Sequence, residues 1–159
     1  METYGFVTFD DVENYLDSYY SKSNNLVCHF RVLDDSQKAG YLMTSIMQID
    51  ALVMQGCIED RTQEHCFPRK GCFKEHTIPE EVKYAQIENA LALFNKSLSA
   101  KSDQQMKTMA SLGLMKNLKG NQSELGSVGF PAIDGGLQSK RKRLESEKAE
   151  RMLRPWIGG

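Results

Sequence analysis

Four residues in the middle of the chain have the types and spacing of metal ligands: Cys57, Cys66, Cys72 and His76. The intervals between them hold eight, five and three residues, which gives the pattern C-x8-C-x5-C-x3-H. Zinc binds thiolates and imidazoles tetrahedrally, and four such ligands leave no coordination position open for water. The pattern therefore predicts one structural Zn²⁺ ion per chain.

Three other residues could compete for the metal. His65 could replace Cys66 as a ligand, but the spacing favours the cysteine. Cys28 and His29 fall in a segment with the composition of a strand, where alternation would turn them to opposite faces, so they are expected to be a core and a surface residue rather than a second site.

The spacing resembles that of the CCCH zinc finger of RNA-processing and mRNA-turnover proteins, over about residues 57–76. The resemblance implies a factor that binds RNA or a ribonucleoprotein in RNA processing or transcription. The residues that would contact RNA are Phe67, Arg69, Lys70, Phe73 and Lys74. The two phenylalanines could equally serve to cover the metal, because a finger of this size has few other apolar side chains.

The charge of the chain is unevenly distributed. The net charge is -1, but residues 138–154 carry +4 and the remainder carries -5. Nonspecific affinity for nucleic acid comes from basic side chains that neutralise phosphates. The negative charge of the residues outside 138–154 therefore argues against tight phosphate binding over the whole surface. The basic run resembles a short nuclear localisation signal, and it could also contact phosphate or be a solvated cluster. It consists of Lys140, Arg141, Lys142 and Arg143.

Several functional classes are disfavoured by what the sequence lacks. It has no apolar run long enough to span a bilayer and no signal-peptide pattern at Met1, which predicts an intracellular protein without a membrane partner. The basic run at residues 140–143 favours the nucleus. Four cysteines in a reducing compartment more often hold metal than form disulfides. The absence of a nucleophile elbow, a phosphate loop and an HExxH pattern predicts that the protein is not an enzyme and has no small-molecule substrate.

Helical periodicity dominates the first half of the chain. Thr8 and Asp11 form a capping-box pair that should begin a helix, and Asp34 or Asp35 should cap a second one that runs to about Gln55. The second helix has an apolar stripe with 3-4 spacing and a methionine stripe beside it, either packed in a core or available to a partner. The methionines are Met43, Met47 and Met54. Between the two helices, residues 26–33 have the branched and aromatic content of a short strand.

The second half of the chain is predicted to become progressively less compact. Thr77 should cap a third helix, and a fourth, marginal helical segment should run from Ser102 to Leu118 and pack on the third. Residues 137–154 have few apolar side chains, which predicts a solvated helix or a disordered tail. Trp156 would then have no core to join and could anchor in a partner's pocket.

The predicted fold is therefore mostly α: a small helical domain built around one structural CCCH zinc finger, with a flexible basic C-terminal tail. The alternative is a structural or protein-interaction subunit of a larger complex, in which the methionine-rich helix or the tail binds a protein and no RNA is bound. The predicted segments are an N-terminal helical segment (1–56), the finger (57–76), a second helical segment (77–118), a linker (119–136) and the tail (137–159).

Overall fold

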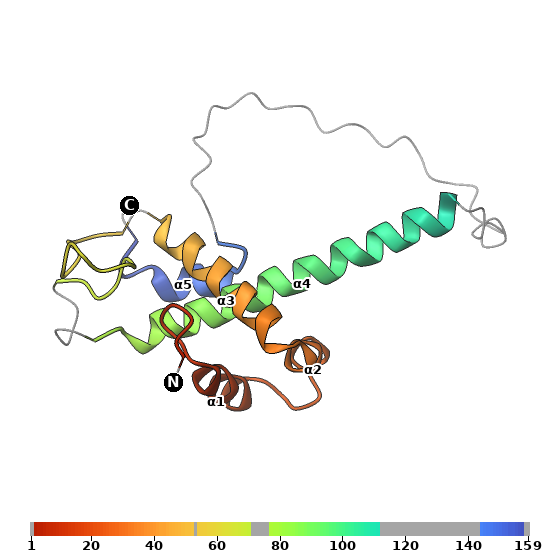
Figure 1. Ribbon diagram of the computed structural model, residues 1–159, viewed down its shortest axis with the longest axis horizontal. Helices are drawn as coiled ribbons and strands as arrows, with labels where there is room; N and C mark the ends of the chain where they lie inside the picture. The colour runs from red at the N-terminus through yellow and green to blue at the C-terminus, as the bar shows by residue number, and fades with distance from the viewer. Residues whose placement is uncertain (1, 53, 71–76, 112–143, 158–159) are drawn as a thin grey trace, which may run out of the picture. The chain divides into compact units, whose positions relative to one another are not determined.

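The structure is a computed structural model that describes residues 2–52, 54–70, 77–111 and 144–157. Within these ranges the regular secondary structure is helical, which confirms the prediction of a mostly helical fold (Figure 1). The helices are α1 (Phe9–Tyr19), α2 (Asn25–Val32), α3 (Asp35–Asp50), α4 (Glu80–Ser111) and α5 (Glu147–Leu153). None of these helices is both long enough and apolar enough to cross a membrane.

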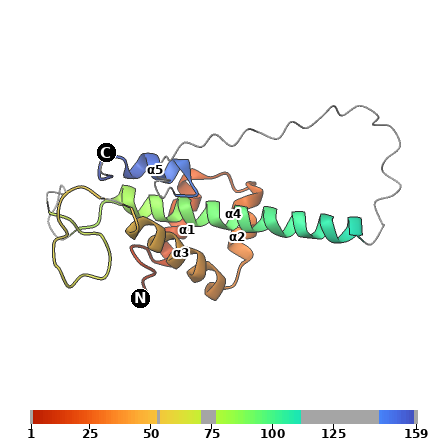
Figure 2. The same ribbon diagram turned by 90° about the horizontal axis from the view of Figure 1, so that it is seen from above.

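The described residues belong to two compact units. The first contains the residues up to Lys96 together with those from Leu144 onward, and the second contains the remainder of α4 from Ser97. In the first unit, α1, α3 and α5 surround the N-terminal part of α4 (Figures 1 and 2). Segments from both ends of the sequence therefore share one core.

Helix α1 begins where the sequence predicts. The Thr8 hydroxyl accepts a hydrogen bond from the Asp11 main-chain N–H, and the Asp11 carboxylate accepts one from the main-chain N–H of Thr8. This reciprocal pair satisfies two donors that the first turn of a helix leaves free. Val12 and Leu16 are buried, whereas Tyr19 at the end of the helix is 57% exposed.

The strand predicted over residues 26–33 is wrong, because this segment forms α2. Asn24 caps the helix by accepting a hydrogen bond from the Val27 N–H. Val27 and Phe30, three residues apart, are buried on one face, which is helical rather than alternating spacing. Cys28 and His29 are both exposed, so the expected division into a core and a surface residue is also wrong.

Helix α3 has the predicted cap at Asp34, which accepts a hydrogen bond from the Gln37 N–H, but it ends at Asp50 rather than near Gln55. Its Leu42, Ile46 and Ile49 side chains are completely buried, which confirms that the leucine and isoleucine stripe is core. Of the methionines, Met43 and Met47 are exposed, whereas Met54 packs against the core. Their predicted contact with a protein partner stays a prediction.

The predicted third helix and the start of the predicted fourth segment are one helix, α4. Neither glycine nor proline occurs between Glu80 and Ser111, so no residue in this range interrupts the main-chain hydrogen bonds. At the start of α4, the main-chain N–H groups of Val82 and Lys83 both donate to the Pro79 carbonyl. The last part of the predicted fourth segment, residues 112–118, lies outside the described residues.

A buried glutamine on α4 holds the N-terminal turn in place. Gln86 accepts a hydrogen bond from the Phe6 N–H through Oε1, and its Nε2 donates to the carbonyls of Tyr4 and Leu42. The side chain is completely buried, so these bonds replace the water that it loses on folding. One amide group thereby links α4 to α3 and to the turn before α1.

A buried asparagine one turn further along α4 performs the same task for α3 and the C-terminal segment. Asn89 Nδ2 donates to the Ser45 hydroxyl and to Gln48 Oε1 on α3. Its Oδ1 accepts from the main-chain N–H groups of Glu145 and Ser146, at 2.9 and 3.3 Å. Asn89 therefore fixes the chain that leads into α5.

The expectation that the tail lacks a core to join is wrong for residues 144–157. Leu144, Ala149 and Leu153 are buried in the cluster that contains Ile46, and Trp156 packs its ring edge-on against Phe67 at 5.8 Å between centroids. Few apolar residues suffice because the other helices supply the rest of the core. The predicted linker and the tail residues 137–143, including the basic run, lie outside the described residues.

Candidate nucleic-acid interface

The structure describes only two of the four predicted zinc ligands. Cys57 is exposed and Cys66 is half-buried, while Cys72 and His76 lie outside the described residues. Among the described residues, no group of three or more His, Cys, Asp and Glu side chains is placed to hold a metal ion. Burial, together with a hydrogen bond to Asp50, raises the pKa of the Cys66 thiol. The zinc ion stays a prediction.

The side chains of Asp50 and Arg69 hold the loop after α3 in place. Asp50 at the end of α3 contacts His65 Nδ1 at 2.8 Å through one carboxylate oxygen and accepts from the Cys66 N–H at 2.8 Å through the other. Arg69 is 8% exposed, and its guanidinium donates to main-chain carbonyls on both sides of the loop. The acceptors are the carbonyls of Met54, Gln55, Gly56 and Cys66.

Two of the predicted RNA contacts are consequently unavailable to a ligand. The Arg69 guanidinium is buried and donates four hydrogen bonds to the main chain, and Phe67 is 2% exposed between Phe6 and Trp156. Phe67 packs in the core cluster, which is neither of the two roles predicted for it. Lys70 is exposed, and Phe73 and Lys74 lie outside the described residues.

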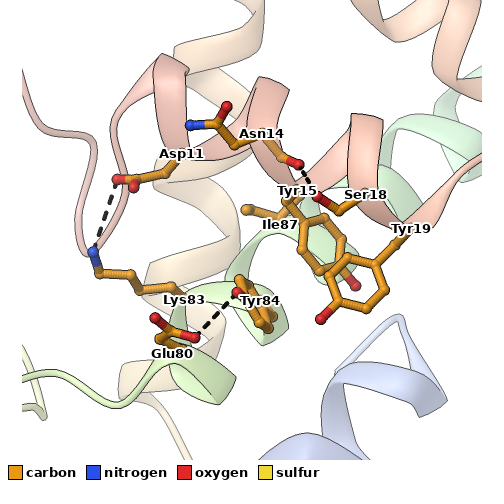
Figure 3. Close-up of a pocket in the computed structure, with 9 residues that line it drawn as sticks. All are labelled: Asp11, Asn14, Tyr15, Ser18, Tyr19, Glu80, Lys83, Tyr84 and Ile87. Atoms are coloured by element: carbon orange, nitrogen blue, oxygen red, sulfur yellow. Dashed lines mark hydrogen bonds and ion pairs between the residues drawn. The ribbon is translucent and has the colours of Figure 1, made fainter.

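A pocket between α1 and α4 combines aromatic and polar side chains at the surface (Figure 3). Its cavity volume is about 150 Å³. The residues that line this tyrosine pocket are Asp11, Asn14, Tyr15, Ser18, Tyr19, Glu80, Lys83, Tyr84 and Ile87.

Three rings form its aromatic wall. Tyr15 is packed against Tyr19 and Tyr84 with centroid distances of 4.6 and 4.8 Å, and Tyr19 lies 5.6 Å from Tyr84. Tyr15 is almost completely buried, whereas Tyr19 is largely exposed. The exposed Tyr19 ring therefore packs on a buried ring and presents an aromatic surface to solvent.

A buried carboxylate beneath the pocket fixes the central ring. Glu88 is 5% exposed, and it accepts hydrogen bonds from the hydroxyls of Tyr15 and Tyr20 at 2.5 and 2.8 Å and from Lys148 Nζ at 2.6 Å. The ammonium group of Lys148 also lies 5.2–5.9 Å from the ring centroids of Tyr15, Tyr19 and Tyr20, within range of a cation–π interaction. Burial, and then the hydrogen bonds to Glu88, raise the pKa of Tyr15 and of Tyr20.

The rim of the pocket is polar and slightly acidic. Lys83 Nζ lies 3.9 Å from Asp11, and the Tyr84 hydroxyl donates to Glu80 at 3.3 Å (Figure 3). One lysine therefore stands against two carboxylates at the rim. Such a site can offer ring faces and hydrogen-bond acceptors to a ligand, but it repels an anion.

Residues 3–155 match the family described as "Putative DnaT-like ssDNA binding protein". The chain belongs to this family. A search of curated proteins and a search of solved structures each found no match.

Membership of the DnaT-like family corrects the identification as a CCCH zinc finger. The match covers nearly the whole chain, including residues 57–76, whereas the C-x8-C-x5-C-x3-H spacing covers about twenty residues and has no counterpart in a matching finger family. The predicted role in RNA processing or transcription is wrong for the same reason, and neither the nuclear assignment nor the alternative of a subunit that binds no nucleic acid gains support. The predicted partner class, nucleic acid, agrees with the family description, which names single-stranded DNA.

Sequence reasoning missed the tyrosine pocket in this member of the DnaT-like family. Two local signals were present: Tyr15 and Tyr19 are one helical turn apart, and so are Tyr84 and Glu88. What the sequence alone did not provide was the contact between the two helices, which are separated by sixty residues.

Proposed function

We propose that this protein binds single-stranded DNA and has no enzymatic activity of its own. The observation that carries the proposal is the match of residues 3–155 to the DnaT-like family. The tyrosine pocket supports it, because proteins that bind single strands commonly stack bases on aromatic side chains. The basic run at residues 140–143 supports it as well, as a source of contacts to phosphate.

The two features would contribute different kinds of affinity. Basic side chains attract the phosphates of single-stranded and double-stranded DNA alike, and this attraction weakens as salt is added. An exposed ring such as that of Tyr19 can stack only on a base whose face is free, which a duplex does not offer. A preference for single strands should therefore come from the aromatic surface.

The proposal is tested by measuring the fluorescence anisotropy of a labelled mixed-sequence DNA oligonucleotide as the protein is added. The same sequence as a duplex and as RNA provides the matched comparisons. We expect the single-stranded DNA to bind more tightly than the duplex at the same salt concentration. Equal affinity for both forms, or no binding to either at low salt, would contradict the proposal.

A further inference from the structure

We infer that the tyrosine pocket receives one unpaired base of a DNA strand, with the ring of Tyr19 as the stacking surface. The inference rests on the proposed function, since it assigns the ligand of one site within it. It also goes further, because it names the part of the nucleic acid that binds, the forces that hold it and a preference among the bases.

The aromatic surface consists of rings that already pack on one another. Tyr19 packs on Tyr15 at 4.6 Å between centroids, and Tyr15 is fixed by its 2.5 Å hydrogen bond to Glu88. Lys148 neutralises the Glu88 carboxylate at 2.6 Å and lies 5.9 Å from the Tyr19 ring. Because the Tyr19 ring already has these contacts, a stacking base should lose little affinity to the ordering of protein side chains.

The size of the cavity suits one base. A cavity of about 150 Å³ is smaller than the roughly 300 Å³ at the lower end of pockets for drug-sized ligands. One flat ring system is therefore a better match to this pocket than a whole nucleotide with its sugar and phosphate.

The charges at the rim of the pocket favour an uncharged ligand. Asp11 and Glu80 at the rim outnumber Lys83, so a phosphate would be repelled where an uncharged base would not. Carboxylate oxygens accept hydrogen bonds from the exocyclic amino groups of cytosine and adenine, and thymine has no such group. The pocket should therefore prefer cytosine or adenine to thymine, and its contribution to binding should change little with salt.

The test is the affinity of oligodeoxycytidine, oligodeoxyadenosine and oligodeoxythymidine for the wild-type protein and for Tyr19→Ala and Tyr19→Phe. Loss of one base–aromatic stack should weaken binding of Tyr19→Ala to the preferred strand by roughly 5- to 100-fold, and by the same factor at low and at high salt. Tyr19→Phe keeps the ring and should bind nearly as the wild type does. Tyr19 is 57% exposed, so both variants are expected to fold, which thermal unfolding would check.

A second variant makes the test independent of Tyr19. Asn14 is exposed and lines the pocket, so Asn14→Trp should fill the cavity and weaken binding while the helix stays intact. If the wild type binds single strands and both Tyr19→Ala and Asn14→Trp bind equally well, the inference is overturned and the proposed function stands. If the wild type binds no single strand, the proposed function itself fails. Equal affinity for the three homopolymers would overturn the preference for amino-bearing bases.

Discussion

Gly5 shows how a single residue can be required by the packing around it. Its φ is +71°, a backbone conformation that side chains with a Cβ rarely adopt, and a Cβ here would lie 2.4 Å from Ile46 Cδ1 and 2.9 Å from Gln86 Nε2. The left-handed conformation and the overpacking should each cost at least about 1 kcal/mol. We expect Gly5→Ala to lower the free energy of unfolding, measured in urea, by about 2 kcal/mol or more.

Gly40 is the matched control for this substitution. It lies inside α3, and a Cβ at this position would have no atom within 4 Å. Because glycine costs helix stability relative to alanine, Gly40→Ala should raise the free energy of unfolding by about 0.5–1 kcal/mol. An equal loss of stability in both variants would show that the close contacts of Gly5 do not exist in solution.

The buried tyrosine hydroxyls should make stability sensitive to alkali. The pKa values of Tyr15 and Tyr20 are raised above 10.0, the usual value for tyrosine, mainly by burial and then by hydrogen bonds to Glu88. Since the folded state holds these protons more tightly than the unfolded state does, the contribution is fully present below about pH 10 and is lost as the pH rises further. Urea unfolding at a series of pH values should show stability falling above about pH 10.

Tyr15→Phe separates this effect from general alkaline unfolding. The variant lacks one hydrogen bond to Glu88, so it should be less stable than the wild type at neutral pH. It also lacks one ionisable hydroxyl, and its further loss above about pH 10 should therefore be smaller. A loss as large as that of the wild type would assign the alkaline sensitivity to other groups.

At the scale of elements, the starts of α1 and α3 were predictable, and strand-like composition was misleading. The caps at Thr8 and Asp34 are local signals, because the capping side chain and the main-chain donors lie within a few residues of each other. Residues 26–33 have branched and aromatic side chains that fit a strand, but this composition does not by itself choose between strand and helix. Asn24, which accepts a hydrogen bond from the Val27 N–H, is a local signal for α2 that the prediction of a strand did not take into account.

Helix α5 depends on tertiary packing, which is why its sequence suggested a solvated tail. Ala149 is completely buried in the core cluster, so Ala149→Asp would place a charge there without a partner. We expect it to lower the free energy of unfolding by about 3 kcal/mol or more, measured in urea. Arg151 lies on the same helix, is exposed and pairs only at 3.7 Å with exposed Glu147, so Arg151→Ala should change stability by less than about 0.5 kcal/mol. Wild-type stability in both variants would mean that α5 does not pack on the core.

At the scale of the molecule, the fold is held together by polar side chains that act across long stretches of sequence. Gln86, Glu88 and Asn89 lie within one turn of α4, and together they bind the N-terminal turn, α1, α3 and the segment that carries α5. Hydrophobic periodicity predicts which residues are buried but says nothing of such pairings. The tyrosine pocket could not be predicted from the sequence for this reason, because its lysine and its tyrosines come from two helices, α1 and α4, that lie far apart in the sequence.

The division of charge along the sequence predicts how salt should act on DNA binding by the whole protein. Residues 138–154 carry +4 and the remainder carries -5, so contacts to phosphate should depend mainly on the run at residues 140–143. Each phosphate contact releases condensed counterions, and for single strands the logarithm of the binding constant falls with the logarithm of the salt concentration by about 0.7 per contact. Replacing Lys140, Arg141, Lys142 and Arg143 with alanine should therefore weaken binding at low salt. The slope of the logarithm of the binding constant against the logarithm of the salt concentration should become shallower by up to about 3. The affinity that remains at high salt should be nearly that of the wild type, because stacking on Tyr19 is not screened. An unchanged slope would move the phosphate contacts to other lysines, such as the exposed Lys101 and Lys107 of α4.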